Sequence, residues 1–541
     1  MHFTTTLFVA YGLLEAAAAF SLPFRLPWAH ALASGEQAPL GLPLDEAAPP
    51  RIAIVGAGAA GSSAAFWISK AKERYGLDVE VDLFDSNEYI GGRSTTVHPY
   101  DDPELYPIEL GASIFVEVNK NMWRATEEFG LNRSDWDEGE DTMGLWDGSK
   151  FVITTDGKLG GWWNTIKVIW RYGYQAPMKT KKLVSSMVAD FVKLYTPEAG
   201  SEPFTNLTAL ATELNWTDAI GQSTMEYFDA QGIYPPWTAE MIEAATRVNY
   251  GQNVDAIHAL EGMCSLAATG ASQVFGGNWQ IFEQFVKRSK AHLFLKTTVK
   301  SIAKDGDKYF LRAHTHGAAE MMERSYRAVI IAAPFHSSSI DLSLTSSAPE
   351  IPPQPYVHLH VTLLSTPSPR PRTRFFKVKD SDTVPTTVLT TWEAVRADPD
   401  APAPDFNSLS YHGKILTRDG VPANSSDDGG EEWSVKIFST QRLEDSWLRR
   451  AFGKIGWVYR KEWDAYPVLP PTTSFPPIKL EKGLYYVNAF EPFISTMETE
   501  TIAARNVVEL LMREEFDASI CKSDGATPRA DNDTFVYGWD C

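Results

Sequence analysis

A glycine-rich turn close to residue 56 constrains the fold of this 541-residue chain more than any other feature. The apolar segment Arg51-Ile-Ala-Ile-Val55 runs directly into Gly56-Ala-Gly58-Ala-Ala-Gly61, and a helical segment follows over 62–72. In a dinucleotide-binding turn the first glycine permits the tight turn, the second lets the backbone approach a pyrophosphate, and the third lets helix and strand pack closely. The N–H groups at the helix N-terminus then bind the phosphates. The sequence therefore predicts a Rossmann-type dinucleotide-binding domain.

The next segment indicates which dinucleotide is bound. A second predicted strand, Val79-Glu-Val-Asp-Leu-Phe84, ends at Asp85, whose carboxylate can accept hydrogen bonds from ribose hydroxyls and would reject a 2′-phosphate. Gly91-Gly92-Arg93 follows on the same loop, where adjacent glycines permit unusual backbone angles and the guanidinium can clamp a phosphate. We interpret this order of residues as typical of a flavin site rather than an NAD site.

Later segments complete the predicted nucleotide-binding sheet. Residues 298–312 alternate around a central Asp-Gly pair and predict a hairpin, and 326–334 is a buried strand with a small-residue end. The predicted strand 483–487 is followed by Ser495-Thr-Met-Glu498, which matches a capping box at the start of a helix that runs to about residue 513. The N-terminus of that helix could stabilise negative charge on a reduced flavin.

Several further blocks of the sequence are distinctive: Glu109-Leu-Gly-Ala-Ser113, Val116-Glu-Val-Asn119, Asn121-Met122, Arg247-Val-Asn-Tyr-Gly-Gln252, Gly276-Gly-Asn278, Trp463-Asp-Ala-Tyr-Pro467, Glu491 and Ser495-Thr-Met-Glu498. In these blocks the chain resembles the prenylcysteine oxidase (prenylcysteine lyase) family of FAD-dependent, amine-oxidase-like flavoproteins. The resemblance extends from about residue 51 to residue 513. The resemblance implies an α/β fold, in which a Rossmann-type FAD-binding domain is interleaved with an α+β substrate domain of mixed sheet and helices.

The resemblance also leads to a domain plan and a set of flavin-binding residues. We predict a signal peptide (1–19), a loose leader (20–50), a discontinuous FAD-binding domain (51–115, 270–335 and 470–515), a substrate domain (116–269 and 336–469) and a C-terminal tail (516–541). The expected cofactor-binding residues are Gly56, Gly58, Gly61, Asp85, Gly92, Arg93, Gly111, Ala112, Ser113, Val299, Glu491, Thr496 and Met497. Non-covalent binding of FAD is expected, since no cysteine lies near 491–498.

For the reaction, the resemblance implies oxidative cleavage of the thioether in S-farnesyl- or S-geranylgeranyl-cysteine during the degradation of prenylated proteins. O2 and water would be consumed, and cysteine, a prenyl aldehyde and H2O2 would be formed. Because the flavin carries the hydride transfer, no side chain is assigned a catalytic role. Arg247, Asn249, Tyr250 and Gln252 could hold the charged ends of the cysteine or make structural hydrogen bonds, and both interpretations stay open.

Two apolar stripes at helical spacing are candidates for lining a prenyl-binding cavity, with ordinary core packing as the alternative. One stripe consists of Trp162, Trp163, Ile166, Ile169 and Trp170, and the other of Leu183, Met187, Phe191 and Leu194.

Two other functions remain open at this stage. The generic flavin motifs also fit an amine or amino-acid oxidase on the same fold. A non-catalytic prenyl-lipid carrier, similar to the Rab escort and dissociation-inhibitor proteins, shares the architecture without using flavin. The intact glycine turn, Asp85 and Arg93 argue against the carrier.

The N-terminus indicates entry into the secretory pathway. Residues 7–14 are mostly apolar and are followed by four alanines at 16–19, the plan of a cleavable signal peptide. Glycosylation sequons begin at Asn132, Asn206, Asn215, Asn424 and Asn532. We expect a lysosomal, vacuolar or extracellular protein, with no later segment long enough to span a membrane and at most peripheral membrane contact.

Charge and cysteine content exclude several partners. The chain has 49 Lys and Arg against 69 Asp and Glu, a net charge of −20 with no basic run, which argues against binding nucleic acid. Its three cysteines exclude a disulfide scaffold; Cys521 and Cys541 could close a loop in the tail and leave Cys264 as a buried free thiol. His358-Leu-His360 alternates as in a half-exposed strand, and because the sequence presents no third ligand, we predict no metal site.

Overall fold

The structure is a computed structural model that describes residues 49–135, 142–155, 161–196, 202–268, 270–344, 348–379, 381–423, 430–522 and 535–541. The predicted signal peptide over 1–19 and nearly all of the predicted leader lie outside the described residues, as do the sequons at Asn424 and Asn532. Among the described residues, no helix combines the length and the apolar character needed to cross a bilayer.

Within the described residues, the nucleotide-binding part is built on a six-stranded sheet with the order β20-β21-β13-β1-β2-β9. Its strands are β1 (Arg51–Val55), β2 (Glu80–Phe84), β9 (His292–Phe294), β13 (Ala328–Ile331), β20 (Lys479–Glu481) and β21 (Leu484–Tyr486). Neighbouring strands pair in parallel, except for the antiparallel pair β20 and β21. Strand β13 and, after its first residue Arg51, strand β1 are apolar and buried because helices and a second sheet cover them.

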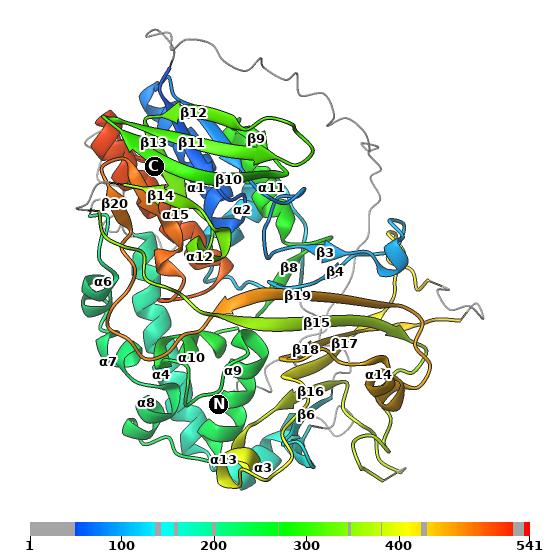
Figure 1. Cartoon of the computed structure of the whole chain (residues 1–541). Coiled ribbons are helices and arrows are strands. Elements are labelled where there is room, and N and C mark those ends of the chain that lie inside the picture. Colours follow the sequence, from blue (N-terminus) through cyan, green and yellow to red (C-terminus); the bar gives the residue numbers. More distant parts are fainter. Residues whose placement is uncertain are drawn as a thin grey trace.

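That second sheet has four strands in the order β12-β11-β10-β14. They are β10 (Thr297–Asp305), β11 (Lys308–Thr315), β12 (Met322–Tyr326) and β14 (Asp341–Ser343). The pairing of Asp305 with Lys308 confirms the predicted hairpin over 298–312. Helix α1 (Ala59–Tyr75) packs against both α11 (Trp279–Ser289) and α15 (Met497–Phe516), which completes the layer of helices beside the first sheet (Figure 1).

The substrate part consists of a seven-stranded sheet and a group of helices (Figure 1). Its strand order is β19-β15-β18-β17-β16-β6-β7, all antiparallel except for the pair β16 and β6. The strands are β6 (Met143–Trp146), β7 (Phe151–Thr154), β15 (Tyr356–Thr366), β16 (Thr387–Thr390), β17 (Ser408–Lys414), β18 (Trp433–Ser439) and β19 (Val458–Pro467). In Figure 1, β15 and β19 run across the middle of the molecule, between the nucleotide-binding sheet and the rest of the substrate part.

The remaining helices, which include those of the substrate part, and several short elements complete the described chain. The helices are α2 (Lys120–Phe129), α3 (Gly161–Tyr172), α4 (Gln175–Phe191), α6 (Leu207–Glu213), α7 (Thr217–Gly221), α8 (Thr224–Ala230), α9 (Glu243–Tyr250), α10 (Ala259–Ser265), α12 (Phe335–Ser338), α13 (Glu393–Ala397) and α14 (Asp445–Phe452). The short helical turns are η1 (Pro99–Asp101), η2 (Val192–Tyr195), η3 (Trp237–Ile242) and η4 (Val487–Phe490). The short strands β3 (Thr96–Val97), β4 (Ile108–Glu109), β5 (Arg133–Asp135) and β8 (Ser272–Val274) form the pairs β3–β4 and β5–β8.

The start of α15 differs from the prediction. The capping box is formed by Thr496 and Thr499, whose side chains and backbone N–H groups bond reciprocally, and the predicted pair Ser495 and Glu498 is wrong. The carboxylate of Glu498 turns instead toward α2, where it accepts hydrogen bonds from the backbone N–H groups of Asn121 (2.8 Å) and Met122 (2.9 Å). Those N–H groups lie in the first turn of α2, so Glu498 satisfies donors that lack partners within that helix.

The cysteines follow the predicted pairing. Cys521 and Cys541 form a disulfide with their Cα atoms 5.4 Å apart, which fastens the C-terminal tail. Cys264 is a free thiol, but it is half-buried rather than buried, because it lies on a cavity wall.

Candidate functional site

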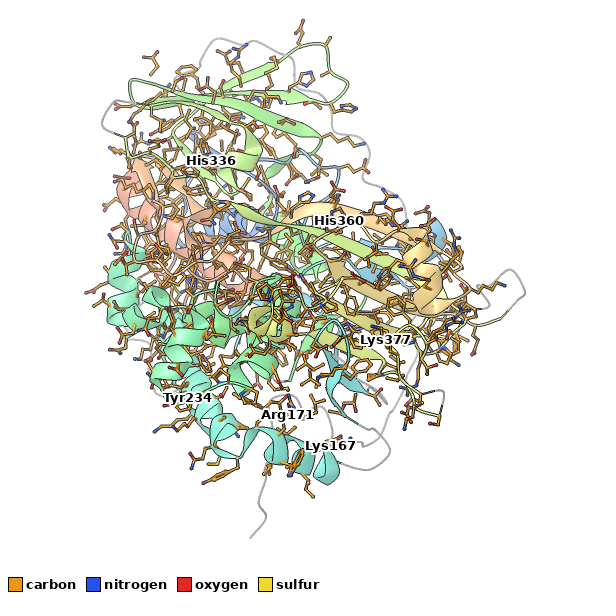
Figure 2. The ribbon with its side chains drawn as sticks, turned by 60° about the horizontal axis from the view of Figure 1, so that its bottom comes forward. Lys167, Arg171, Tyr234, His336, His360 and Lys377 are labelled. Carbon is orange, nitrogen blue, oxygen red and sulfur yellow. A yellow bond between two sulfur atoms is a disulfide. The ribbon has the colours of Figure 1, made fainter. Side chains whose placement is uncertain are left out.

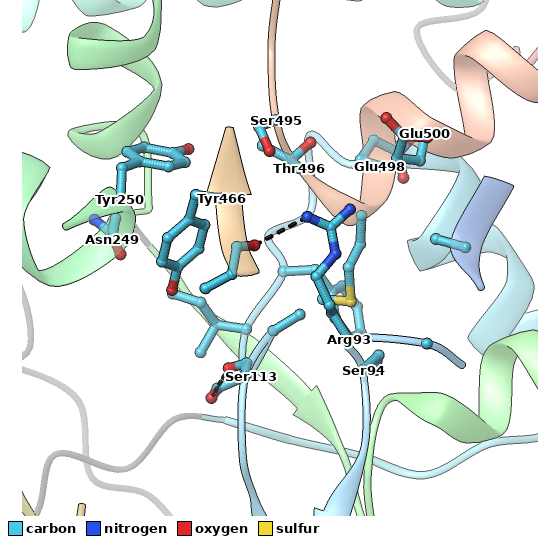
Figure 3. A pocket seen from close by; sticks show the side chains of 18 of the residues that line it. Arg93, Ser94, Ser113, Asn249, Tyr250, Tyr466, Ser495, Thr496, Glu498 and Glu500 are labelled. Carbon is cyan, nitrogen blue, oxygen red and sulfur yellow. Dashed lines mark hydrogen bonds between the residues drawn. The ribbon is translucent and has the colours of Figure 1, made fainter. Parts of the chain in front are cut away.

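A cavity of about 1350 Å³ is lined by both the nucleotide-binding sheet and the seven-stranded sheet. Typical ligand pockets enclose about 300–1,000 Å³, so this cavity has room for more than one small ligand. Figure 3 shows part of its wall, where Arg93, Ser113, Tyr250 and Thr496 come from segments far apart in the chain.

The glycine-rich turn forms one end of the cavity. The N–H of Gly56 donates to the carbonyl of Phe84 (2.7 Å), which continues the parallel pairing of β1 with β2 to the start of the turn between β1 and α1. A Cβ on Gly61 would lie 1.8 Å from the carbonyl oxygen of Gly56, so Gly61 allows close packing of helix on strand, and it does not line the cavity. A Cβ on Gly58 would meet only the Cα of Gly92, at 3.8 Å. Gly58 and Gly92 therefore lie close together on the cavity wall, and with no side chains over them they form a cradle whose backbone a dinucleotide can approach.

Asp85 stands at the end of β2 on the wall of this cradle. Its Oδ2 accepts a hydrogen bond from the N–H of Ala57 (2.7 Å), and its Oδ1 accepts one from the N–H of Asn87 (2.8 Å). Burial raises the pKa of Asp85, although these backbone hydrogen bonds oppose the shift. Each carboxylate oxygen has more than one acceptor position, so Asp85 can hold the turn and still accept a hydrogen bond from a ribose hydroxyl.

Arg93 lies on the cavity wall but does not extend freely into it. Its guanidinium forms an ion pair with the buried Glu491 and donates to the carbonyl of Ala465 (2.9 Å). Tyr356 donates to the same Glu491 carboxylate (2.5 Å). Glu491 already neutralises the charge of Arg93, so the ion pair links the loop after β2 to the end of η4. Arg93 is therefore not the free phosphate clamp that the sequence had suggested.

Buried polar atoms beside this ion pair lack partners within the described residues. They are Oδ1 of Asn488 and Oε1 of Glu500, both on cavity-lining side chains. Burial, followed by the neighbouring charge of Glu491, raises the pKa of Glu500 well above its ordinary value. A ligand with several hydroxyl groups would satisfy these atoms, and the ribityl chain of FAD is such a ligand. These polar atoms and the open glycine cradle therefore fit FAD.

The other predicted cofactor-binding residues also line the cavity. They are Gly111, Ala112, Ser113, Val299, Thr496 and Met497. The backbone N–H of Ser495, one residue before the helix cap, donates to the buried carboxylate of Glu261 (3.2 Å). Burial raises the pKa of Glu261 to about 8, so near neutral pH this carboxyl group is largely protonated.

The predicted substrate residues divide into two pairs. Arg247 donates to Thr390 (2.8 Å), Asn253 and Asn407, and Gln252 bonds to the backbone of Pro467 and Leu469; neither lines the cavity. Asn249 and Tyr250 do line it. Arg247 and Gln252 therefore make structural hydrogen bonds, and only Asn249 and Tyr250 are placed to contact a substrate.

The two apolar stripes also differ. Met187 and Phe191 of α4 line the cavity, whereas Leu183 and Leu194 do not. In α3, Trp170 is 88% exposed, and Ile166 and Ile169 face the solvent as well, so this stripe does not line the cavity. The side chains of Trp162 and Trp163 lie outside the described part of the chain. A helical period identifies an apolar face without indicating what that face meets.

Sequence reasoning missed Lys436, a buried lysine on the cavity wall. Its Nζ donates to Oγ of Ser113 (2.9 Å) and to the carbonyl of Glu109 (3.1 Å). Burial lowers the pKa of Lys436 and raises that of Glu109, and the attraction between the two groups opposes both shifts. A signal was present in the sequence, since the lysine stands between the apolar residues Val435 and Ile437 at the centre of strand Trp433–Ser439.

The wall of the same cavity includes a region of apolar side chains, which we call the apolar chamber. Side chains from β6, α4, α9, α10 and β16 surround it, among them Met143, Leu145, Met187, Phe191, Val248, Cys264 and Leu389.

Three of the predicted glycosylation sequons lie in the described part of the chain. Their first residues, Asn132, Asn206 and Asn215, are exposed at the protein surface.

Comparison with solved structures identifies the fold. The structure resembles wild-type putrescine oxidase bound to putrescine with a TM-score of 0.52 and 13% identity, covering 86% of this chain and 99% of that chain. A double mutant of the same enzyme gives a TM-score of 0.54 at 14% identity. The protein therefore has the amine-oxidase-like flavoprotein fold, with a Rossmann domain and a mixed-sheet substrate domain, as predicted.

Comparison with known sequences identifies the family. Human prenylcysteine oxidase 1 is 28% identical over 485 residues, covering 86% of this chain and 89% of the human protein. Farnesylcysteine lyase of Arabidopsis thaliana is 28% identical over 489 residues, covering 87% and 89%. The NAD(P)-binding Rossmann-like domain model matches residues 54–129, and the prenylcysteine lyase model matches residues 158–525. Since that second match spans most of the chain, the protein belongs to the prenylcysteine lyase family, as the resemblance implied.

Proposed function

We propose that this protein is an FAD-dependent oxidase that cleaves the thioether of S-farnesyl- or S-geranylgeranyl-L-cysteine. The thioether, O2 and water would be converted to cysteine, a prenyl aldehyde and H2O2. The observation that carries the proposal is the continuity of the glycine cradle with the apolar chamber, in one cavity of about 1350 Å³. A dinucleotide and a long hydrocarbon chain could occupy it together.

When bound, FAD would supply the two-electron oxidation of the carbon next to sulfur and would be reoxidised by O2. The chain would hold it non-covalently through the Gly58–Gly92 cradle, Asp85, and the polar atoms of Asn488 and Glu500. The apolar chamber would keep the prenyl group away from bulk water and position its first carbon at the flavin end.

Lys436 would bind the carboxylate of the cysteine part of the substrate. Its ammonium group is buried at the cavity wall, where Ser113 and the carbonyl of Glu109 orient it. Arg247, the cation predicted for this role, lies outside the cavity, and Arg93 lines the cavity but is paired with Glu491. A charge-assisted hydrogen bond in such a dry site is stronger than one in water.

The exposed face of α3 and α4 would rest on a lipid bilayer, in which prenylated substrates partition. Trp170, Tyr174 and Met178 are 88%, 59% and 60% exposed, and Lys167 and Lys179 flank them. Trp and Tyr favour the membrane interface, and Lys is attracted to anionic lipids. Figure 2 labels Lys167 and Arg171 of α3, at the periphery of the molecule.

We also propose that the protein acts in the secretory pathway, in a lysosome, a vacuole or outside the cell. The disulfide between Cys521 and Cys541 is of the kind that persists in oxidising compartments. The exposed sequons at Asn132, Asn206 and Asn215 support the same route.

The test is an assay of purified protein with bound flavin. Farnesylcysteine and geranylgeranylcysteine should each produce H2O2, free thiol and aldehyde in equal amounts, while a panel of primary and secondary amines should produce none. Peroxide from amines alone would identify an amine oxidase instead. Protein that retains no bound flavin after incubation with FAD and removal of the excess would exclude both oxidases.

A further inference from the structure

Three potential metal ligands converge on the strand pair β15 and β19, on side chains that the proposed reaction does not use. His358 and His360 are two residues apart on β15 and so project from the same face. The antiparallel register places His358 opposite Asp464 and His360 opposite Glu462. The sequence-based premise that no third ligand exists is therefore wrong, because the register of two strands supplies one.

The distances between these groups are close to those in a metal site. His358 Nε2 lies 3.3 Å from Glu462 Oε1, and His360 Nδ1 lies 3.6 Å from Glu462 Oε2. One ligand atom from each of the three residues lies within 4.8 Å of the other two. Ligand atoms around a tetrahedral zinc ion, each about 2.0–2.2 Å from the metal, are about 3.3–3.6 Å apart. Small side-chain rotations would therefore close the site.

The surroundings favour a cation. His358 Nδ1 lies 3.2 Å from Asp464 Oδ1, so that carboxylate can orient the ring and leave Nε2 directed at the shared ligand position. Arg460, two residues before Glu462 on β19, is paired with Asp445 and so adds little positive charge near the two histidines. The side chains of His358 and Glu462 are 52% and 60% exposed, which gives an ion access and leaves a position for water.

We propose that His358, His360 and Glu462 form a binding site for a divalent transition-metal ion of the Zn²⁺ class. Two imidazoles and one carboxylate are a ligand set that Zn²⁺ accepts, with water in the fourth position. Asp464 serves as the partner that orients His358. Figure 2 shows His360 on the strand that crosses the molecule.

The site would connect two strands of the cavity wall. Tyr356 and Leu359 of β15 and Trp463 and Ala465 of β19 all line the cavity. A metal ion bound to His360 and Glu462 would cross-link these strands directly and reduce their relative motion. Tyr356 also donates to Glu491, so the cross-link would stiffen the wall next to the Arg93 ion pair.

The test uses the flavin-loaded protein after treatment with a chelator and removal of that chelator. Calorimetric titration with ZnCl2 should show one ion bound per chain, and the thermal unfolding midpoint should rise with zinc concentration, because the ion binds only the folded state. His360→Ala and Glu462→Gln should each weaken zinc binding by about tenfold or more. Far-ultraviolet circular dichroism and flavin content verify that each variant is folded.

His292→Ala is the matched control. His292 also lies beside a carboxylate, with its Nδ1 3.2 Å from Asp82 Oδ1, but it belongs to no three-residue cluster among the described residues. This variant should bind zinc as the unmodified protein does. The proposal is overturned if the unmodified protein binds no zinc in stoichiometric amounts, or if His360→Ala and Glu462→Gln bind it as tightly as the unmodified protein; in either case the cluster is a set of surface ion pairs.

Discussion

At the scale of single residues, Gly58 controls whether a dinucleotide can reach the backbone. A Cβ added there would have only Gly92 Cα within 4 Å, and because Gly58 lines the cavity, a larger side chain would occupy the cradle. We expect Gly58→Val to yield folded protein with little or no flavin absorbance. The measurements are the ratio of flavin to protein absorbance and the circular dichroism spectrum.

A control for that substitution is Gly221→Ala, whose added methyl group would contact only Thr473. It should retain flavin in full. A Gly58→Val protein that also retains its flavin would refute the role of Gly58 in approaching the pyrophosphate.

Lys436 is the second residue with a specific expected effect. Lys436→Met keeps most of the side-chain volume and removes the charge, and the neighbouring Glu109 can then remain protonated, because burial raises its pKa. Since a hydrogen bond to a charged group contributes about 1.5–3 kcal/mol, KM for farnesylcysteine should rise by about tenfold to hundredfold, with flavin retained.

The matched substrate for this test is S-farnesylcysteamine, which lacks the carboxylate. Its KM should be nearly the same for Lys436→Met and for the unmodified protein. An equal increase in KM on both substrates would show that Lys436 acts on the shape of the cavity and not on the carboxylate.

At the scale of elements, α3 illustrates how a helix can carry an apolar face that no other element covers. Trp170→Glu should reduce binding to vesicles of phosphatidylcholine and phosphatidylserine by about tenfold or more, because burying one large apolar side chain contributes about 1.5–3 kcal/mol. Co-sedimentation measures the bound fraction. Activity on substrate dissolved below its micelle concentration should stay unchanged, since Trp170 does not line the cavity.

Val421→Glu is the control, because Val421 is also an exposed apolar residue, 58% exposed, but lies far from α3 in the sequence. It should bind vesicles as the unmodified protein does. If Trp170→Glu and Val421→Glu bind equally well, α3 is not the membrane-contacting surface.

At the scale of the whole molecule, buried ionisable groups predict how stability depends on pH. Burial raises the pKa of Glu261 from 4.5 to about 8 and that of Glu498 to about 6. The folded state then holds protons that the unfolded state has released, so between pH 4.5 and pH 8 stability decreases as pH rises. Burial lowers the pKa of His258 from 6.5 to about 4, so stability decreases as pH falls from 6.5 to 4.

The opposing effects balance only near pH 4, because two carboxyl groups act against one histidine. The thermal unfolding midpoint, measured at constant ionic strength, should be higher near pH 6 than at pH 8, and its increase should level off toward pH 4. Glu261→Gln should flatten the decrease on the alkaline side. A midpoint that rises steadily from pH 6 to pH 8 would contradict the assignment of Glu261 as a buried, protonated carboxyl group.

The sequence by itself determined the features that depend on neighbours a few residues away. The spacing of Gly56, Gly58 and Gly61 encodes the turn because φ angles and close packing act locally, and the hairpin over 298–312 follows from alternation around one turn. Family motifs along the chain then indicated the flavoprotein fold, which the comparisons confirmed.

Only the tertiary structure decided which distant groups meet. Buried charges must find partners, but a sequence pattern does not say which: Glu498 bonds to α2 rather than its own helix, and Lys436 reaches Ser113 across 323 residues. The exposed stripe of α3 and the convergence of Glu462 on His360 depend likewise on how helices pack and on strand register. Local geometry is set by short-range sterics, whereas burial and pairing are set by the assembled chain. The glycine cradle could therefore be predicted from the sequence, whereas the place of Lys436 on the cavity wall and of Arg247 outside it could not.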